Sequence, residues 1–259
     1  MRKAIFFDID GTLWDEYMRI PQSTIEAVGA FQASGGYTFI CTGRSRSNIR
    51  SKELLEMGFD GIIAACGTHI EFGDAKIFEQ LMTSQEVEHA LAVIKQYGMS
   101  VVLEGPKYTY VDEAAFLDDP YVIHLRKELG EDVKTIEGSK TYEINKLSAV
   151  LNGADFNEVK DAFGASFDVI RHSEELLEIV PAGHSKATGI KRVCETLEIA
   201  QENTYAFGDS ANDIEMLQFV AHGIAMGNGS EAVKEAAEYV TTDIHEDGIY
   251  NGLKYYDLI

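Results

Sequence analysis

The apolar residues Ala4 to Phe7 lead directly into two aspartates, Asp8 and Asp10, which are one residue apart. A run this apolar is typical of a central parallel strand that is buried on both faces. The carboxyl ends of such strands form the edge at which open α/β sheets bind their ligands. The pattern therefore predicts an α/β fold with a doubly wound parallel sheet and two carboxylates at its ligand-binding edge.

These two carboxylates repel one another unless a cation lies between them or one of them is neutralised. A hard divalent ion such as Mg²⁺, which prefers oxygen ligands, is the natural counterion. Gly11 allows the chain to turn sharply after the strand, and the hydroxyl and amide of Thr12 can hold that turn. The alternative is a solvated Asp-Gly turn that caps a helix, because this dipeptide is common in turns.

A second acidic loop, at residues 208–213, follows another apolar stretch. Its Asp209 could share a metal ion with Asp8, whereas Asp213 could cap the next helix or hold the waters of the metal. Asn212 lies between these two acids. The alternative is that Asp209 and Asp213 serve only as helix caps. Taken with the first loop, the pattern predicts one metal site built from both.

Two further segments could hold an anion. The Thr42 hydroxyl and the Gly43 amide end a strand and could receive an oxyanion at the start of the next helix, and Arg44 could bind the same anion or face solvent. Lys186 lies in the first turn of a predicted helix, where a cation is unfavourable against the helix dipole unless an anion is nearby. The alternatives are a capped turn for the first segment and a solvated lysine for the second.

Strand and helix patterns alternate at both ends of the chain and follow a different order in the middle. The N-terminal part predicts strands at 4–8, 37–41 and 60–65, helices at 22–34 and 45–57, and a hairpin that turns at Gly73 and Asp74. The middle predicts helices at 85–97, 114–129 and 155–163 and strands at 100–104, 107–111, 146–151, 167–171 and 176–180. The C-terminal part predicts helices at 185–197, from 213 onward and at 230–237, and strands at 204–207, 223–226 and 238–241. We therefore expect a discontinuous core of residues 1–82 and 183–259 with an inserted α+β cap domain of residues 83–182.

The chain of 259 residues carries 22 Lys and Arg against 43 Asp and Glu, a net charge of −21. Nucleic-acid binding depends on clustered Lys and Arg, so this charge argues against it. The charge also opposes the approach of an anionic substrate, which a metal ion and a lysine at the site could attract locally. No apolar stretch approaches the ~20 residues that span a bilayer, and the N-terminus runs straight into a strand. We expect a cytoplasmic protein that binds neither nucleic acid nor membranes and is a monomer or a homodimer.

Four motifs occur in order along the chain: DxDGT at 8–12, TGR at 42–44, the lysine at 186 and GDxxND at 208–213. Together they resemble the four motifs of the haloacid dehalogenase superfamily of phosphotransferases. The insert of about a hundred residues between the second and third motifs further resembles Cof-type phosphatases with a type IIB (C2) cap. By this resemblance we expect a Rossmann-like core with an inserted cap.

The resemblance also implies a role for each motif. Asp8 would be the nucleophile that forms an aspartyl-phosphate, and Asp10 the general acid for the leaving alcohol and then the base for the hydrolytic water. Metal binding would fall to Asp8, the main-chain carbonyl of Asp10 and Asp209, with Asp213 supporting the metal shell. Phosphate binding would fall to Thr42, Gly43, Lys186 and Asn212. These roles suit phosphoryl transfer, which asks a protein mainly for positioning and charge neutralisation.

The expected function is that of a Mg²⁺-dependent phosphoric monoester hydrolase acting on small phosphorylated metabolites, with sugar phosphates before nucleotides. Asp10 distinguishes the first motif from that of the ion-pump branch, which resembles DKTGT and lacks an acid at that place. One alternative is a phosphomutase of the phosphomannomutase type, whose cap resembles this one. The other is a non-catalytic binder of phosphorylated metabolites.

Several residues outside the motifs carry weaker expectations. Cof-type proteins often have Asn-Gly-Ala where this chain has Cys66-Gly67-Thr68, so the leaving group that is recognised could differ. The cysteines lie far apart without CxxC spacing, so we expect buried free thiols at Cys41, Cys66 and Cys194. We expect His69 and His184 to be local hydrogen-bonders. Specificity candidates in the insert are Tyr108, Tyr110, His124, Tyr142 and Glu143, although aromatic residues at strand spacing more often pack.

Overall fold

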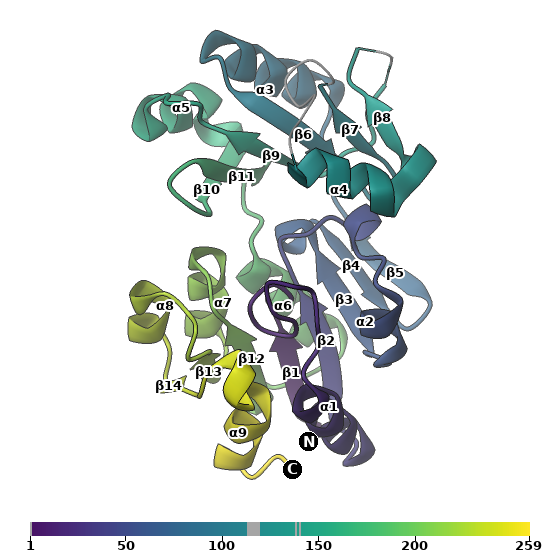
Figure 1. The fold of residues 1–259 in the computed structure, drawn as a ribbon, viewed down its shortest axis with the longest axis vertical. Helices are drawn as coiled ribbons and strands as arrows, with labels where there is room; N and C mark the ends of the chain where they lie inside the picture. The colour runs from purple at the N-terminus through teal and green to yellow at the C-terminus, as the bar shows by residue number, and fades with distance from the viewer. Residues whose placement is uncertain (1, 113–119, 138, 140) are drawn as a thin grey trace.

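The computed structural model describes residues 2–112, 120–137, 139 and 141–259 and contains two β-sheets, the first at the bottom of Figure 1 and the second at the top. The first sheet contains, in spatial order, β14 (Tyr239–Val240), β13 (His222–Ala225), β12 (Thr204–Gly208), β1 (Ala4–Phe7), β2 (Tyr37–Cys41), β3 (Gly61–Ala64), β4 (His69–Phe72) and β5 (Ala75–Glu79). The strands from β14 to β3 are parallel, whereas β3, β4 and β5 are antiparallel. The strand order reverses at β1, which lies between β12 and β2, and such a reversal marks the ligand-binding point of a doubly wound sheet.

Helices cover both faces of the first sheet. On one face lie α1 (Gln22–Ala33) and α9 (Gly248–Tyr255), and on the other lie α6 (Lys186–Thr196), α7 (Ile214–Phe219) and α8 (Glu231–Ala236). Within β1, Ile5 and Phe7 pack with the first group, and Ala4 and Phe6 pack with the second. All four side chains are fully buried, and this double burial explains why β1 is apolar throughout.

The second sheet contains, in spatial order, β10 (Phe167–Arg171), β11 (Leu176–Pro181), β9 (Lys146–Val150), β6 (Ser100–Glu104), β7 (Thr109–Val111) and β8 (Val133–Thr135). All neighbouring pairs are antiparallel except β7 and β8. The helices α3 (Ser84–Gln96) and α5 (Phe156–Phe163) pack on one face, and α4 (Pro120–Leu129) packs against β6 and β7 on the other. The fold is thus the predicted α/β sheet with an α+β insertion, while the domain boundaries at 82 and 182 stay a prediction.

The helix expected at residues 45–57 is wrong, because this segment contains a 3₁₀ turn at Arg46–Asn48 and only a short helix, α2 (Lys52–Glu56). Ser47 and Asn48 are buried and use their side chains for hydrogen bonds to Thr109 and Glu104 of the second sheet. These tertiary bonds compete with a continuous helix. Ser51 then caps α2 by accepting a hydrogen bond from the backbone of Leu54.

Other differences from the sequence prediction are smaller. The expected helix at 114–129 corresponds to α4 from Pro120 onward, and its first residues lie outside the described part of the chain. The sequence did not reveal β8 or α9, and the last strand of the first sheet has two residues instead of four. Further 3₁₀ turns lie at Ala65–Gly67, Gly130–Asp132, Gly164–Ser166, Gln201–Asn203, Ala211–Asp213 and Ile244–Glu246. Within the described ranges, no helix has the length and apolar character that crossing a membrane requires.

Candidate active site

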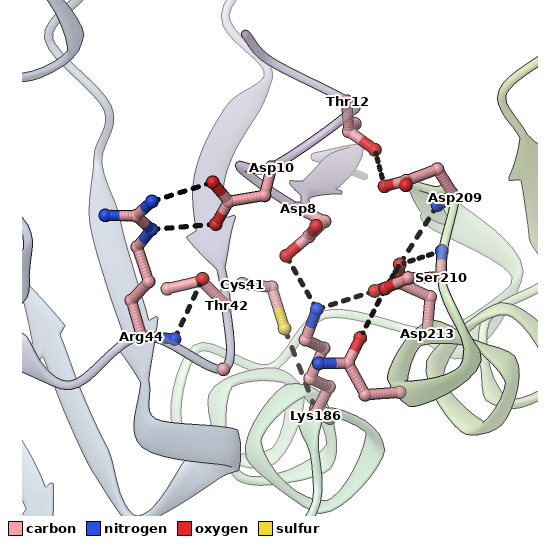
Figure 2. A network of polar contacts seen from close by, with 12 residues as sticks. Asp8, Asp10, Thr12, Cys41, Thr42, Arg44, Lys186, Asp209, Ser210 and Asp213 are labelled. Carbon is pink, nitrogen blue, oxygen red and sulfur yellow. Dashed lines mark hydrogen bonds and ion pairs between the residues drawn. The ribbon is translucent and has the colours of Figure 1, made fainter. Parts of the chain in front are cut away.

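Asp8 lies directly after β1, at the point where the strand order of the first sheet reverses. Its backbone N–H donates to the carbonyl of Phe207 at 3.0 Å, which ties it to the end of β12. Because β1, β2 and β12 are parallel, Thr42 and Asp209, which follow β2 and β12, reach the same edge. The Asp8 carboxylate is buried and points toward Lys186 (Figure 2).

Lys186 is the first residue of α6, and its side chain is buried between two carboxylates (Figure 2). Nζ donates to Oδ1 of Asp8 at 2.6 Å and to Oδ1 of Asp213 at 2.7 Å. Burial alone would lower the pKa of this lysine, but the charges of Asp213 and Asp8 raise it well above its usual range. The cation in the first helical turn is therefore fully compensated, as its unusual position had suggested.

Asp209 joins the second acidic loop to the first, and Asp213 holds the second loop in shape. Thr12 donates through Oγ1 to Oδ1 of Asp209 at 3.0 Å, and Oδ2 of Asp213 accepts from the backbone N–H groups of Asp209 and Ser210, both at 3.0 Å. Gly11 has φ +76°, and a Cβ there would lie 2.5 Å from Oδ2 of Asp209. Only glycine therefore allows the first loop to pass this close to the Asp209 carboxylate.

The acidic side chains form a set that suits a hard divalent cation. Asp8, Asp209 and Asp213 can each offer a carboxylate oxygen within 4.8 Å of the other two. Burial raises the pKa of Asp8 more than Lys186 lowers it, and burial followed by the charge of Asp213 raises the pKa of Asp209 to about 7. Both shifts arise first from burial and then from the charges of the neighbouring carboxylates, which one lysine does not balance. An all-oxygen set short of positive charge fits an ion such as Mg²⁺.

The Asp10 carboxylate lies outside this set and binds Arg44 through both oxygens (Figure 2). Arg44 donates from Nε to Oδ2 at 2.7 Å and from Nη2 to Oδ1 at 2.8 Å, and Trp14 donates from Nε1 to Oδ1 at 2.9 Å. Burial opposes ionisation of Asp10, but these bonds and the charge of Arg44 lower its pKa below the usual range. The sequence had left Arg44 to bind the phosphate or face solvent, whereas it forms an ion pair with Asp10. Because its carboxylate is bound to Arg44 and Trp14, Asp10 can offer a metal ion only its main-chain carbonyl.

The residues expected to bind phosphate meet beside Asp8. Thr42 accepts a hydrogen bond at Oγ1 from the backbone of Arg44 at 3.1 Å. Asn212 accepts at Oδ1 from the Ser210 hydroxyl at 2.8 Å, and a Cβ on Gly43 would lie 3.1 Å from its Nδ2. Thr42, Gly43 and Asn212 line one cavity with Asp8, while Lys186 reaches Asp8 from below in Figure 2. The sequence prediction thus names a set of side chains that the fold brings together.

The cavity has a volume of about 600 Å³ and lies between the two sheets. Around the residues that follow β1, β2 and β12, the second sheet contributes a wall that the sequence did not identify. Its members are Val102 and Glu104 of β6, Lys146, Ser148 and Val150 of β9, Leu176 and Glu178 of β11, and His172. The volume is in the range of cavities that hold small-molecule ligands.

A buried ion cluster in this wall joins the two sheets. Lys146 donates from Nζ to Oε1 of Glu178 and to the carbonyl of Gly43, both at 2.7 Å, and lies 3.5 Å from Oε1 of Glu104. Glu178 accepts at Oε2 from Nδ2 of Asn212 at 2.8 Å. Burial raises the pKa of Glu178, but Lys146 beside it and the hydrogen bonds of Lys146 and Asn212 lower that pKa to about 2. The carboxylate therefore carries its charge at neutral pH.

A signal for this wall is present in the sequence. Register pairs Glu104 with Lys146 and Glu178 with Ser148, so these polar residues share one face of the second sheet. Between them, Leu147 and the other intervening apolar residues pack under α3 and α5. Polar and apolar residues thus alternate along β9, as in a strand with one face toward a ligand cavity.

The weaker sequence expectations have mixed outcomes. Tyr110 packs edge-on against Tyr108 and Tyr142, which confirms packing for these three aromatic residues. Glu143 lines a different cavity, and the side chain of His124 lies outside the described part of the structure.

The three cysteines and the two histidines match their predictions. Cys41, Cys66 and Cys194 are buried and free. The ring nitrogens of His69 contact Glu71 and Glu79, and Nδ1 of His184 contacts the carbonyls of Pro181 and Ala182. Cys66 also reaches the site, because its Sγ lies 3.5 Å from Oε2 of Glu178.

Known proteins are similar to this chain over nearly its whole length. Residues 5–253 match the model of a haloacid dehalogenase-like hydrolase family. YkrA of Bacillus subtilis (strain 168), named as a candidate phosphatase, is 33% identical over 257 residues, which cover 97% of this chain and 96% of the relative. YitU of the same organism, named a 5-amino-6-(5-phospho-D-ribitylamino)uracil phosphatase, is 28% identical and covers 97% of this chain and 96% of its own length.

A solved structure agrees with these relatives. The structure described as the subclass IIB sugar phosphatase BT4131 superposes with a TM-score of 0.87 and 32% identity, covering 99% of this chain and all of the other. The motifs at Asp8, Thr42, Lys186 and Asp209 therefore lie within a match that extends over both sheets. The chain belongs to the haloacid dehalogenase-like hydrolases and is a phosphatase of that family.

Proposed function

We propose that this phosphatase is Mg²⁺-dependent and hydrolyses small phosphorylated metabolites, sugar phosphates in particular, through an aspartyl-phosphate. The observation that carries the proposal is the contact of Lys186 with both Asp8 and Asp213 beside a set of carboxylates, where Asp8 lines the cavity. A phosphoryl group there would meet a buried cation and a carboxylate oxygen at the same point. Positioning and charge neutralisation are what phosphoryl transfer requires.

In the proposed reaction, a carboxylate oxygen of Asp8 attacks phosphorus, and the bond to the leaving oxygen breaks. Asp10 gives its proton to that oxygen and then takes a proton from the water that attacks the phosphorus of the aspartyl-phosphate. This attack breaks the bond between phosphorus and the Asp8 oxygen, which releases inorganic phosphate and restores the Asp8 carboxylate. Lys186, Asn212 and the Thr42 hydroxyl hold the phosphoryl oxygens, so charge that develops on them meets donors fixed in advance.

The metal would be held by Asp8, Asp209 and the main-chain carbonyl of Asp10, with Asp213 supporting this shell. When bound, Mg²⁺ neutralises charge on the phosphoryl group and on the carboxylates. The chain's own contribution is to keep these oxygens in place: Thr12 holds Asp209, and Lys186 and the backbone of residues 209 and 210 hold Asp213.

Sugar phosphates are favoured by the size and lining of the cavity. A volume of about 600 Å³ exceeds what a phosphoryl group needs and leaves space for a leaving group of metabolite size. Ser148, His172 and Glu178 offer polar atoms to hydroxyls. The named activities of BT4131 and YitU, one on sugars and one on a ribityl-bearing phosphate, support the same substrate class.

The test is phosphate release from a panel of phosphorylated metabolites and an aryl phosphate, with Mg²⁺ or with EDTA, for the wild type and for Asp8→Asn. We expect metal-dependent release that the substitution abolishes, because an amide oxygen is a poor nucleophile at phosphorus. Full activity of Asp8→Asn would defeat the proposal. Conversion of a sugar phosphate into its isomer with little free phosphate would identify a phosphomutase, and binding without turnover would identify a non-catalytic binder.

A further inference from the structure

The wall that the second sheet contributes to the cavity carries more negative than positive charge. Glu104 and Glu178 stand against a single lysine, Lys146, and all three are nearly fully buried. From this arrangement, and resting on the proposed phosphatase function, we propose that the enzyme selects esters whose leaving group is neutral and hydroxyl-bearing and rejects those with a second anionic group. The selecting element is this wall and not the phosphate site below it.

Lys146 is already paired with two carboxylates of the wall. Its ammonium contacts the carbonyl of Gly43 and the carboxylates of Glu178 and Glu104, at 2.7, 2.7 and 3.5 Å. Two of its three N–H donors hydrogen-bond to Gly43 and Glu178, and the Glu104 carboxylate adds an ion pair. A carboxylate or phosphate on the leaving group would have to displace a buried carboxylate from this lysine, and a buried charge that loses its partner is costly.

The other cations at the site also face carboxylates of the chain. Arg44 places two donors on Asp10, and Lys186 bridges Asp8 and Asp213. The phosphoryl group of the substrate and its metal ion account for the remaining charge beside Asp8. Across the described residues that line the cavity, the remaining group able to carry positive charge is His172, whose buried Nδ1 lacks a hydrogen-bond partner. A neutral imidazole suits a hydroxyl, to which it can donate or from which it can accept.

The rest of the wall also suits a neutral leaving group. Val102, Val150 and Leu176 supply apolar surface that can pack against the carbon chain of a polyol. Ser148 and the carboxylate of Glu178 supply oxygens that can accept from its hydroxyls. The net charge of the whole chain, −21, adds a long-range repulsion against a second anion.

The experiment compares matched ester pairs at pH 8, above the usual titration range of histidine. Sorbitol 6-phosphate and 6-phosphogluconate differ by CH₂OH against a carboxylate at the far end of one carbon chain, and glycerol 3-phosphate and 3-phosphoglycerate form the short counterpart. We expect kcat/KM for the neutral member to exceed that for the acid by about tenfold or more, because the added carboxylate would enter a wall that carries two carboxylates against one lysine. Equal values, or preference for an acid, would overturn the inference.

The variant Glu104→Gln tests whether the wall causes the selection. Glu104 does not contact the residues proposed to bind phosphate; its carboxylate accepts from Asn48 and Ser148 and lies near Lys146. Removing its charge leaves Lys146 with one carboxylate, so we expect the preference for the neutral ester to fall about threefold to tenfold. The matched control, Glu88→Gln on the exposed side of α3, removes the same charge far from the cavity and should leave the ratio unchanged.

Failure of this inference and failure of the proposed function give different results. No phosphate from any ester, the aryl phosphate included, would refute the phosphatase proposal. Hydrolysis of the aryl phosphate but of neither neutral polyol ester would refute the selection alone. If Glu104→Gln keeps the far-ultraviolet circular dichroism of the wild type and also its ratio of kcat/KM values, the wall does not cause the selection. If that variant does not fold, the wild-type ratios still decide whether the enzyme prefers the neutral esters.

Discussion

Arg44 donates two hydrogen bonds to the carboxylate of Asp10, at 2.7 and 2.8 Å, and thereby lowers the pKa of the residue proposed as general acid and base. The pair stabilises ionised Asp10, the form that can accept a proton from water. The form that protonates the leaving oxygen requires a proton on Asp10 and therefore a weaker contact with Arg44. This ion pair thus sets the pH range in which both half-reactions can proceed.

Arg44→Met should move the pH profile of kcat/KM upward. Without the guanidinium, burial raises the pKa of Asp10 unopposed by Arg44, so the limb that reports its ionisation moves to higher pH. We expect kcat at pH 7 to fall by about tenfold or more. The matched control is Arg46→Met, which breaks an ion pair with Glu71. A profile that is lower at every pH but not displaced would contradict this role for Arg44.

Lys186→Met should destroy activity and also destabilise the fold. It leaves Asp8 and Asp213 buried without their cation, which costs about 3–5 kcal/mol of unfolding free energy, and it removes a fixed charge worth about 10²–10³ in kcat. Urea unfolding and phosphate release measure the two effects. Lys191→Met, an exposed lysine of the same helix, should change neither. If Lys186→Met in EDTA were as stable as the wild type, the buried ion pairs of Lys186 would not be needed for stability.

Mg²⁺ should raise the melting temperature of the wild type but hardly that of Asp209→Asn. At a hundred times its Kd a ligand adds about 2.7 kcal/mol, which is roughly 5–10 °C for a chain of this size. The pKa of Asp209 is raised to about 7, so its ionised form costs stability at pH 8. In EDTA at pH 8 the variant should therefore be at least as stable as the wild type. A larger Mg²⁺ shift in the variant would place the metal elsewhere.

Glu178 should make the protein sensitive to acid. Its pKa is lowered to about 2 from 4.5, so its contribution to stability is complete above pH 4.5 and is lost as the pH falls toward 2. The contribution is on the order of 3 kcal/mol, since each pKa unit corresponds to about 1.4 kcal/mol. In Glu178→Gln the unfolding free energy should fall less steeply across this range than in the wild type or in Glu88→Gln. Parallel curves for all three proteins would contradict the assignment.

The sequence could predict the first sheet and its edge because both depend on local patterns. The apolar run before Asp8 requires burial on both faces, and a lysine in the first turn of a helix requires a nearby anion. Each pattern occurs within a few residues of one motif. The parallel arrangement then brings the motifs together without further information.

The parts that the sequence did not predict depend on partners distant in the chain. Glu104, Lys146 and Glu178 acquire their role only when three strands pair in one register and face the first sheet. Ser47 and Asn48 break a helix because they reach Thr109 and Glu104, about sixty residues away. The partner of Arg44 could not be predicted for the same reason. Arg44 pairs with Asp10 only because the loops after two different strands approach one another.

The position of β1 in the first sheet has a consequence for the order in which the chain acquires structure. Ala4 pairs with Thr204 on one side, whereas every strand of the second sheet lies between Ser100 and Pro181. A ribosome that adds about 5–20 residues per second needs roughly 10–40 s to reach the partner of β1. We therefore expect the second sheet to emerge complete while the central strand of the first still has an open, wholly apolar edge. Nascent chains stalled after β11 has left the ribosome but before β12 has done so should bind chaperones more than finished ones.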